Sequence, residues 1–448
     1  MVKSSLDFLD QEDDRADSTA GQEFSRSLSL RMDTERPKIR EDLEFYPVQS
    51  TGTTVIVVHD RLGLVEKGKS MSLELYRVMT MLDGTRSMRD LQIDLMRQQG
   101  GRLISIEEVE SLLAELDSSY LLDSQRYGEV RREIISRFSA QEIRYCSHVG
   151  LSYPREEEEL TKRLETILAS QEVPFFPNGR ITAVVAPHID LEAGKRVYSS
   201  AYQAIKGITP ERVIILGVGH SMASEMFSLT KKTFETPLGR VETDQAIVME
   251  LTKAGDAIVS RDDFAHRDEH SIEFQLLFLQ NILRDVSFTV VPILCGPLKG
   301  CLPDYSREKY RSIGRDFLRI LADAAGKDGT IVVAGVDLSH VGPKFGHDMS
   351  ASFIIDQSER HDRQLLDFLC AGNADGFWSE SRRIEDRYNV CGFAALVCLL
   401  EALPPSQGHL LGYEIFKEDA TKSAVSFAAA IFTSIGSEDS KVRKKIAD

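Results

Sequence analysis

Four short apolar runs in the C-terminal two-thirds of the chain restrict its fold more than any other feature. Each run is rich in β-branched residues and short enough for one buried strand, and segments with helical spacing separate the runs. Reactive side chains follow every run. The runs and the residues after them are 181–186 with His188, 213–216 with His220, 288–294 with Cys295, and 331–336 with Asp337 and His340.

This alternation of strands and helices predicts an α/β fold built on a mixed or parallel sheet. In such sheets ligands bind beyond the carboxyl ends of the parallel strands, where these side chains are expected to converge. Three of the four runs lead to a histidine, although the whole chain has only ten. A hydrogen-bonded loop residue is the simplest interpretation of any one histidine, but three on three strands favour a metal or acid–base site.

The composition limits the classes of protein to which the chain can belong. Its 448 residues predict two domains, and its 42% hydrophobic content suffices for a substantial core. The net charge of −16, with no basic block before residues 441–445, argues against a nucleic-acid partner. No apolar stretch approaches the ~18 residues needed to cross a membrane. Six scattered cysteines without a Cys-x-x-Cys pair predict reduced thiols in a cytoplasmic protein.

The chain divides into five predicted segments. A polar, disordered arm is expected over residues 1–38, and a mobile tail over 437–448. Between them we expect a small domain over 43–123, a charged connector helix over 124–142 and a large domain over 143–436.

The small domain is expected to contain a strand at 53–59, three helices and a short closing strand at Leu121-Leu122. Ser87 and Ser105 begin the second and third helices, each with an acidic residue three positions later that suits a capping box. This order is typical of a winged helix. The stretches LDGTRSMRDLQIDLM and IEEVESLLAELDSSYLL resemble the PqqD-like family, which recognises peptide leaders. A generic three-helix module is the alternative.

A polar cluster precedes an apolar helix in the large domain. His266, His270 and Glu273 have spacings of four and three, which would place them on one face if the helix begins early enough. The cluster does not match the His-Glu-x-x-His pattern of zinc proteases, because its glutamates stand at other positions. A polar helix terminus with a satisfied His–Glu pair is the alternative to a catalytic site.

Cys391 differs from the other cysteines because it opens the apolar helix 393–400. A thiol at a helix N-terminus is expected to have a lowered pKa, which suits a soft metal ligand or a nucleophile. Asp337 and His340 are close enough in the chain to pair, so that the carboxylate would fix the imidazole tautomer. An aspartate that caps the following turn is the alternative. Cys295 is expected to be part of the core.

The large domain resembles the Memo family, the group that includes AmmeMemoRadiSam system protein B. Seven stretches occur in the family order. They are Gly150-Leu151-Ser152-Tyr153-Pro154, Ala186-Pro187-His188, Ile215-Leu216-Gly217-x-Gly219-His220, Thr236-Pro237-Leu238-Gly239-x-Val241-x-x-Asp244, Glu269-His270-Ser271-Ile272-Glu273-x-Gln275-Leu276, Asp337-Leu338-Ser339-His340 and Cys391-Gly392.

The resemblance implies a fold similar to the class III (LigB-type) extradiol dioxygenases, which use a non-haem metal. It places His188, His220 and Cys391 at the metal. His270 and His340 would line the pocket, with Asp337 supporting His340, and Glu273 joins them as a catalytic candidate. The chain departs from the family pattern at Gly219, where Ser or Asn is usual. It also departs at 189–192, where the family has a Gly and an aromatic residue.

The resemblance leaves three functions open. The first is an oxidoreductase that holds Fe or Cu, binds O₂ or a small substrate at open positions, and uses His270 or His340 as a general base. A radical-SAM partner in a modification pathway is implied by the family name. The second is a non-catalytic scaffold that binds a peptide or phosphopeptide in the same pocket. The third is a thiol hydrolase that uses Cys391.

Overall fold

The structure, a computed structural model, describes residues 36–50, 53–172, 179–298, 302 and 304–435. They form two compact units that meet in the chain between Arg137 and Phe138. Most of the predicted arm (1–38) and the whole predicted tail (437–448) lie outside the described residues. Within the described residues, no helix is long and apolar enough to cross a membrane.

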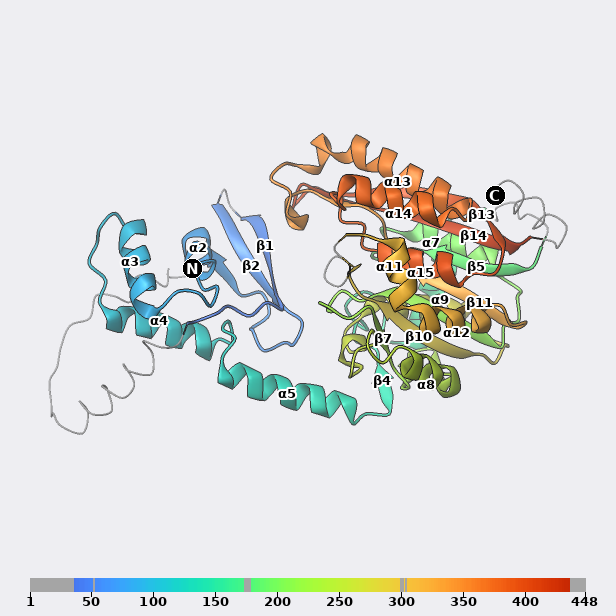
Figure 1. The fold of residues 1–448 in the computed structure, drawn as a ribbon, viewed down its shortest axis with the longest axis horizontal. Helices are drawn as coiled ribbons and strands as arrows, with labels where there is room; N and C mark the ends of the chain where they lie inside the picture. Colours follow the sequence, from blue (N-terminus) through green and yellow to red (C-terminus); the bar gives the residue numbers. More distant parts are fainter. Residues whose placement is uncertain (1–35, 51–52, 173–178, 299–301, 303, 436–448) are drawn as a thin grey trace. The chain divides into compact units, whose positions relative to one another are not determined.

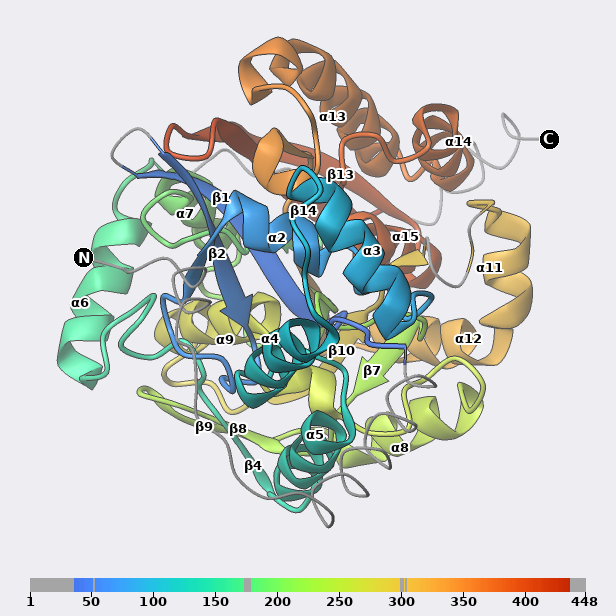
Figure 2. The ribbon, with the colours of Figure 1, turned by 90° about the vertical axis from the view of Figure 1, so that its left-hand side faces the viewer.

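The small unit is a three-stranded antiparallel sheet followed by helices (Figure 2). Its elements are β1 (Leu43–Ser50), β2 (Thr53–Asp60), β3 (Ser70–Ser72), α2 (Leu73–Met79), α3 (Met88–Gln98), α4 (Ile106–Ser118) and α5 (Gln125–Ser139). The capping boxes predicted at Ser87 and Ser105 are confirmed. The closing strand predicted at Leu121-Leu122 is wrong: Leu122 forms only an isolated bridge with Ile39, because α5 begins three residues later and ends the extended segment. The winged-helix likeness stays a prediction.

The four apolar runs are confirmed as the central strands of the large unit. They are β5 (Ile181–Ala186), β6 (Arg212–Val218), β10 (Thr289–Cys295) and β11 (Thr330–Gly335). They are mutually parallel and lie side by side in the order β5-β11-β6-β10. Antiparallel strands extend both edges, so the sheet is mixed. These are β14 (Ser423–Ser434), β13 (Ser406–Glu418) and β12 (His340–Val341) beyond β5, and β7 (Phe227–Leu229) beyond β10.

Helices cover both faces of this sheet (Figure 1). One face packs against α6 (Glu157–Leu168), α7 (Lys195–Ala204) and α9 (His270–Ile282). The other packs against α8 (Gln245–Ala254), α12 (Arg315–Ala325), α13 (Ile355–Cys370), α14 (Ala374–Ile384) and α15 (Phe393–Ala402). The unit also contains α11 (Arg307–Ile313) and a small sheet of β4 (Ile143–Tyr145), β8 (Thr233–Thr236) and β9 (Gly239–Val241). The central strands are apolar over most of their length, as expected for strands with both faces buried.

Two strand glycines bring α9 close to the end of the sheet. A Cβ at Gly217 on β6 would lie 2.6 Å from Ser271 Oγ, and one at Gly335 on β11 would lie 2.4 Å from Ser271 O. Neither glycine has a positive φ, so close approach of the helix explains them better than a sharp turn does. The first turn of α9 therefore lies directly against two strand ends.

Candidate metal centre

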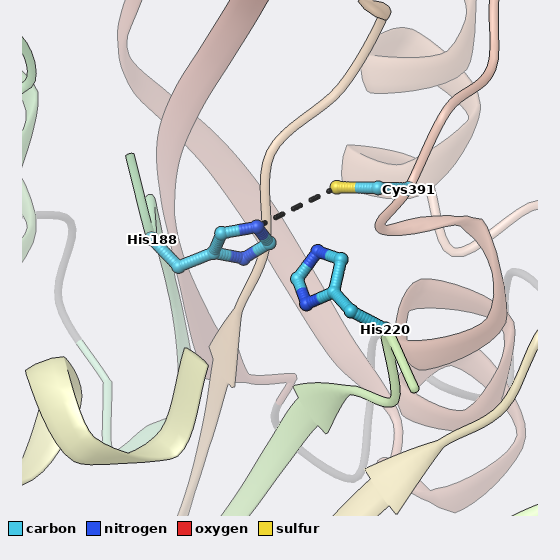
Figure 3. A group of neighbouring side chains, drawn as sticks. All are labelled: His188, His220 and Cys391. Carbon is cyan, nitrogen blue, oxygen red and sulfur yellow. Dashed lines mark hydrogen bonds between the residues drawn. The ribbon is translucent and has the colours of Figure 1, made fainter. Parts of the chain in front are cut away.

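Three potential metal ligands from three separate elements converge beyond the strand ends. His188 follows β5, His220 follows β6, and Cys391 precedes α15. Figure 3 shows the two imidazoles and the thiol turned toward a common region. Their ligand atoms lie within 4.8 Å of one another, and Cys391 Sγ is 3.7 Å from His188 Nε2. The three side chains could therefore hold one metal ion.

The imidazole of His188 is held in the orientation and tautomer that a ligand needs. Its Nδ1 lies 3.0 Å from Gly335 O, which can only accept, so Nδ1 carries the proton and Nε2 presents its lone pair toward Cys391. The backbone N–H of His188 donates to Asp337 Oδ1 at 3.0 Å. Burial lowers the pKa of His188, which keeps the ring neutral and available for coordination.

The imidazole of His220 is held instead by a carboxylate. Its Nδ1 lies 2.9 Å from Oε2 and 3.1 Å from Oε1 of Glu269, the N-cap residue of α9. Burial opposes ionisation of Glu269, but His220 and a hydrogen bond from Ser271 N–H hold the pKa of its carboxyl well below its usual range. A carboxylate on the remote nitrogen orients a metal-binding imidazole and raises its basicity.

His270 is the first residue of α9 and lies beside both proposed histidine ligands. Its ring centroid is 5.1 Å from that of His188 and 5.1 Å from that of His220. His220, Glu269 and His270 form a second group of potential ligands. Burial lowers the pKa of His270 well below its ordinary value, so the ring is neutral. His148 lies against it, with 5.3 Å between the ring centroids.

Asp337 and His340 do not form the predicted pair. The carboxylate of Asp337 accepts the backbone N–H of His188, whereas His340 Nδ1 lies 2.9 Å from Leu338 O. Asp337 therefore supports His188, the residue beyond the adjacent strand, and it does not cap the following turn. Burial lowers the pKa of His340 to about 4.

The predicted low pKa of Cys391 is wrong. Burial, followed by the charge of Asp337, raises the pKa of the thiol well above its ordinary value. Gly392 is the N-cap of α15, so the thiol lies outside the helix end, and its Sγ contacts Asp337 O at 3.5 Å. A protonated thiol argues against the hydrolase interpretation, but a coordinated cation would deprotonate it outright. Cys295 is buried in the core, as predicted.

Glu273 belongs to a group that we call the clamp, made of the buried residues Arg144, Tyr153 and Glu273 and the partly exposed Ser147. Arg144 forms an ion pair with Glu273, to which Tyr153 OH donates at 2.5 Å. The backbone N–H groups of Ser147 and His148 donate to the same carboxylate, each at 3.0 Å. These contacts occupy both oxygens and favour a structural role over the predicted catalytic one. His266 also lies outside the site, because α9 begins only at His270 and His266 Nε2 contacts Ser228 O at 3.0 Å.

Two residues of the site were not singled out from the sequence. Glu269 stands immediately before His270, and this adjacency is the signal that could have identified it. His148 lies two residues before the Gly-Leu-Ser-Tyr-Pro stretch that opens the domain, and no local pattern marks it.

Comparison with known proteins identifies the family. The family model for Memo-like proteins matches residues 144–431. The chain belongs to the Memo family. A MEMO1 family protein of Aquifex aeolicus is 30% identical over 400 residues, which cover 89% of this chain and 100% of the relative. One from Methanopyrus kandleri is 30% identical over 299 residues, covering 63% of this chain and 96% of the relative. One from Thermus thermophilus is 26% identical over 343 residues, which cover 76% of this chain and 97% of the relative.

The relatives differ in how much of this chain they match. The Aquifex match is longer than the Memo region and the short remainder after it, so it extends into the small unit. The Methanopyrus relative is matched almost completely by 63% of this chain, a span short enough to fit within the large unit. The match with the Aquifex relative therefore includes at least part of the small unit.

Proposed function

We propose that this Memo-family protein holds a redox-active metal ion, iron or copper, through His188, His220 and Cys391. The observation that supports the proposal most is the convergence of three ligand atoms from three elements within 4.8 Å. The fixed tautomer of His188 and the carboxylate on His220 add to it, because a structural histidine needs neither.

The donor set restricts the choice of metal. Two imidazoles and one thiolate suit copper, iron or zinc and disfavour magnesium or calcium. A bound iron or copper ion would supply one-electron redox and Lewis-acid chemistry. We propose a likeness to the LigB-type extradiol dioxygenases for the arrangement of the site. Ordinary catechol ring cleavage is disfavoured, because those enzymes have a carboxylate where this chain has Cys391.

We assign distinct roles to the residues around the three ligands. Asp337 and Glu269 orient His188 and His220. His270 is the first candidate for a general base, because it is neutral and lies against both histidine ligands. His340 is the second candidate, placed beyond the end of β11.

The charge of the metal-free site bears on the alternative function, a phosphopeptide-binding scaffold. Glu269 is ionised there, and burial keeps His188 and His270 neutral. A phosphate group would therefore meet negative charge, whereas a divalent cation would be attracted. This favours a metal site over phosphate recognition by the metal-free protein.

Metal content tests the proposal directly. The purified chain is expected to retain nearly stoichiometric iron or copper by elemental analysis. Replacement by His188→Ala, His220→Ala or Cys391→Ser should remove it without unfolding the protein, and the controls His59→Ala and Cys370→Ser should not. Retention of metal by all three site variants would refute the assignment. A metal that supports no O₂ consumption with any reductant would favour the scaffold.

A radical-SAM protein is the proposed partner, and the small unit is its proposed contact. The partner is suggested by the family resemblance, and the small unit is chosen as the contact because the Aquifex match extends into it. Affinity capture with the full chain and with residues 138–448 alone tests the idea, because the chain divides into two compact units at this point. Equal capture by both would exclude the small unit as the contact.

A further inference from the structure

A buried carboxylate lies on α13, outside the groups discussed so far. The side chain of Asp362 is 0% exposed and accepts three hydroxyl hydrogen bonds. Ser339 Oγ donates to it at 2.6 Å, Ser426 Oγ at 2.5 Å and Tyr413 OH at 2.9 Å. Burial raises the pKa of Asp362, while the hydroxyls of Ser339 and Ser426 oppose that rise. Burial of a carboxylate costs free energy, so its presence calls for an explanation other than core packing.

The three hydroxyls connect Asp362 to the loop that follows β11. Ser339 is the central residue of this loop, between Asp337 and His340. Its own N–H donates to Ser426 Oγ at 2.9 Å, and that hydroxyl in turn donates to Asp362. Backbone bonds from Leu338 N to Ser426 O at 2.8 Å and from Ser426 N to Ser339 O at 3.0 Å tie the loop to β14. The carboxylate of Asp362 thus binds hydroxyl groups on both the loop after β11 and strand β14.

The same loop carries Asp337, which contacts two of the three proposed ligands. Its carboxylate accepts the N–H of His188 at 3.0 Å. Its carbonyl oxygen accepts the N–H of Gly392 at 3.0 Å and contacts Cys391 Sγ at 3.5 Å. A shift of the loop would therefore move His188 and Cys391 relative to each other.

We propose that Asp362 is a positioning residue for the metal centre. Its carboxylate fixes the loop 337–340, and through Asp337 this loop sets the separation of His188 and Cys391. The effect on metal binding rests on the proposed function, but the effect of Asp362 on the loop can be measured in the metal-free protein.

Cobalt(II) binding to the full chain tests the proposal, because thiolate-to-cobalt charge-transfer absorption reports the bond to Cys391. Asp362→Asn keeps the size of the side chain but turns an amide N–H₂ toward hydroxyl donors. We expect about a tenfold loss of cobalt affinity and a weaker or shifted charge-transfer band. Leu365→Ala in the core on the same helix should lower the melting temperature without changing the band. Exposed Asp367→Asn should change neither.

Hydrogen exchange of the metal-free protein supplies an independent readout. Asp362→Asn should accelerate amide exchange in residues 337–342 by at least about tenfold over the rest of the unit, whereas Leu365→Ala should not single out this segment. Tyr413→Phe removes one donor and is the milder variant to use if Asp362→Asn does not fold. An unchanged band with unchanged local exchange would overturn the inference. Wild-type protein that binds no cobalt would instead contradict the proposed function, and the exchange result would still decide the role of Asp362.

Discussion

Two buried glutamates, four residues apart near the start of α9, have different surroundings and different roles. Glu269 faces the candidate metal centre and holds His220, whereas Glu273 faces the clamp and is paired with Arg144. Both carboxyl groups have pKa values well below the ordinary range. An arginine neutralises a carboxylate permanently, while a histidine leaves the carboxylate able to support a metal ligand. The partner therefore decides the role of each glutamate.

The largest effect is expected when the clamp loses its cation. Arg144→Met leaves Glu273 buried without a counter-charge and should lower the free energy of unfolding by about 3–5 kcal/mol in urea denaturation. Exposed Arg240→Met, which breaks a surface pair with Glu235, is the control and should cost at most about 1 kcal/mol. A loss below about 1 kcal/mol for Arg144→Met would show that the clamp does not depend on charge.

His266 contacts the clamp, because its carbonyl oxygen accepts a hydrogen bond from Arg144 Nε at 2.9 Å. We expect this histidine to make the stability of the protein sensitive to acid. Burial lowers the pKa of His266 to about 4, below its ordinary value of 6.5. His266 therefore binds a proton more readily in the unfolded chain than in the folded protein. The free energy of unfolding keeps its full value above pH 6.5 and decreases as the pH falls from 6.5 toward 4, by about 3 kcal/mol at most. His266→Gln should remove this one-proton part of the pH dependence in denaturation at several pH values. An identical slope in both proteins would contradict the assignment.

On the metal side, loss of a charge should reduce binding more than stability. Glu269→Gln should weaken metal affinity by about 10- to 100-fold in competition with a chelator, because His220 loses its carboxylate partner. Glu192→Gln removes an exposed carboxylate that pairs with Lys195, so it is the matched control and should bind as the wild type does. If Glu269→Gln lowered stability as much as Arg144→Met and left affinity unchanged, the contrast between the two glutamates would fail.

The smallest effect is expected at Ser147, which touches both regions. Its Oγ lies 3.2 Å from Glu273 Oε2 and 2.9 Å from Nδ1 of His148, the ring that packs against His270. Ser147→Ala should cost about 1 kcal/mol of stability. Metal affinity should change by less than about twofold in the same chelator competition. A larger loss of affinity would make His148 part of the metal centre rather than its border.

The sequence predicts the centre of the fold well because the four parallel strands are buried on both faces. It also marks His188 and His220 beyond strand ends and Cys391 at a helix start, and the family resemblance joins these three as a ligand set. It does not reveal that β11 lies between β5 and β6, so the real partner of Asp337 could not be inferred. Nor does it separate Glu269 from Glu273, because Arg144 is 129 positions away from Glu273 in the chain.

The error at Cys391 has the same origin. A rule based on one helix end ignores the burial of the thiol, which is the main cause of its raised pKa, and the Asp337 carboxylate that another element brings to it. Local patterns therefore indicate which residues cluster at the site. The charged groups next to each of these residues depend on strand order and on segments that are distant in the sequence.

The site requires glycine at positions 217 and 335, and a comparison of the ligand residues alone would not reveal this. They contribute hydrogen atoms where any other residue would place a methyl group against Ser271. An enzyme designer who transplanted every histidine, carboxylate and thiol onto another parallel sheet would still fail if the two receiving strands carried alanine. The helix would then stand farther from the sheet, and His270 would move away from the imidazoles that it now contacts.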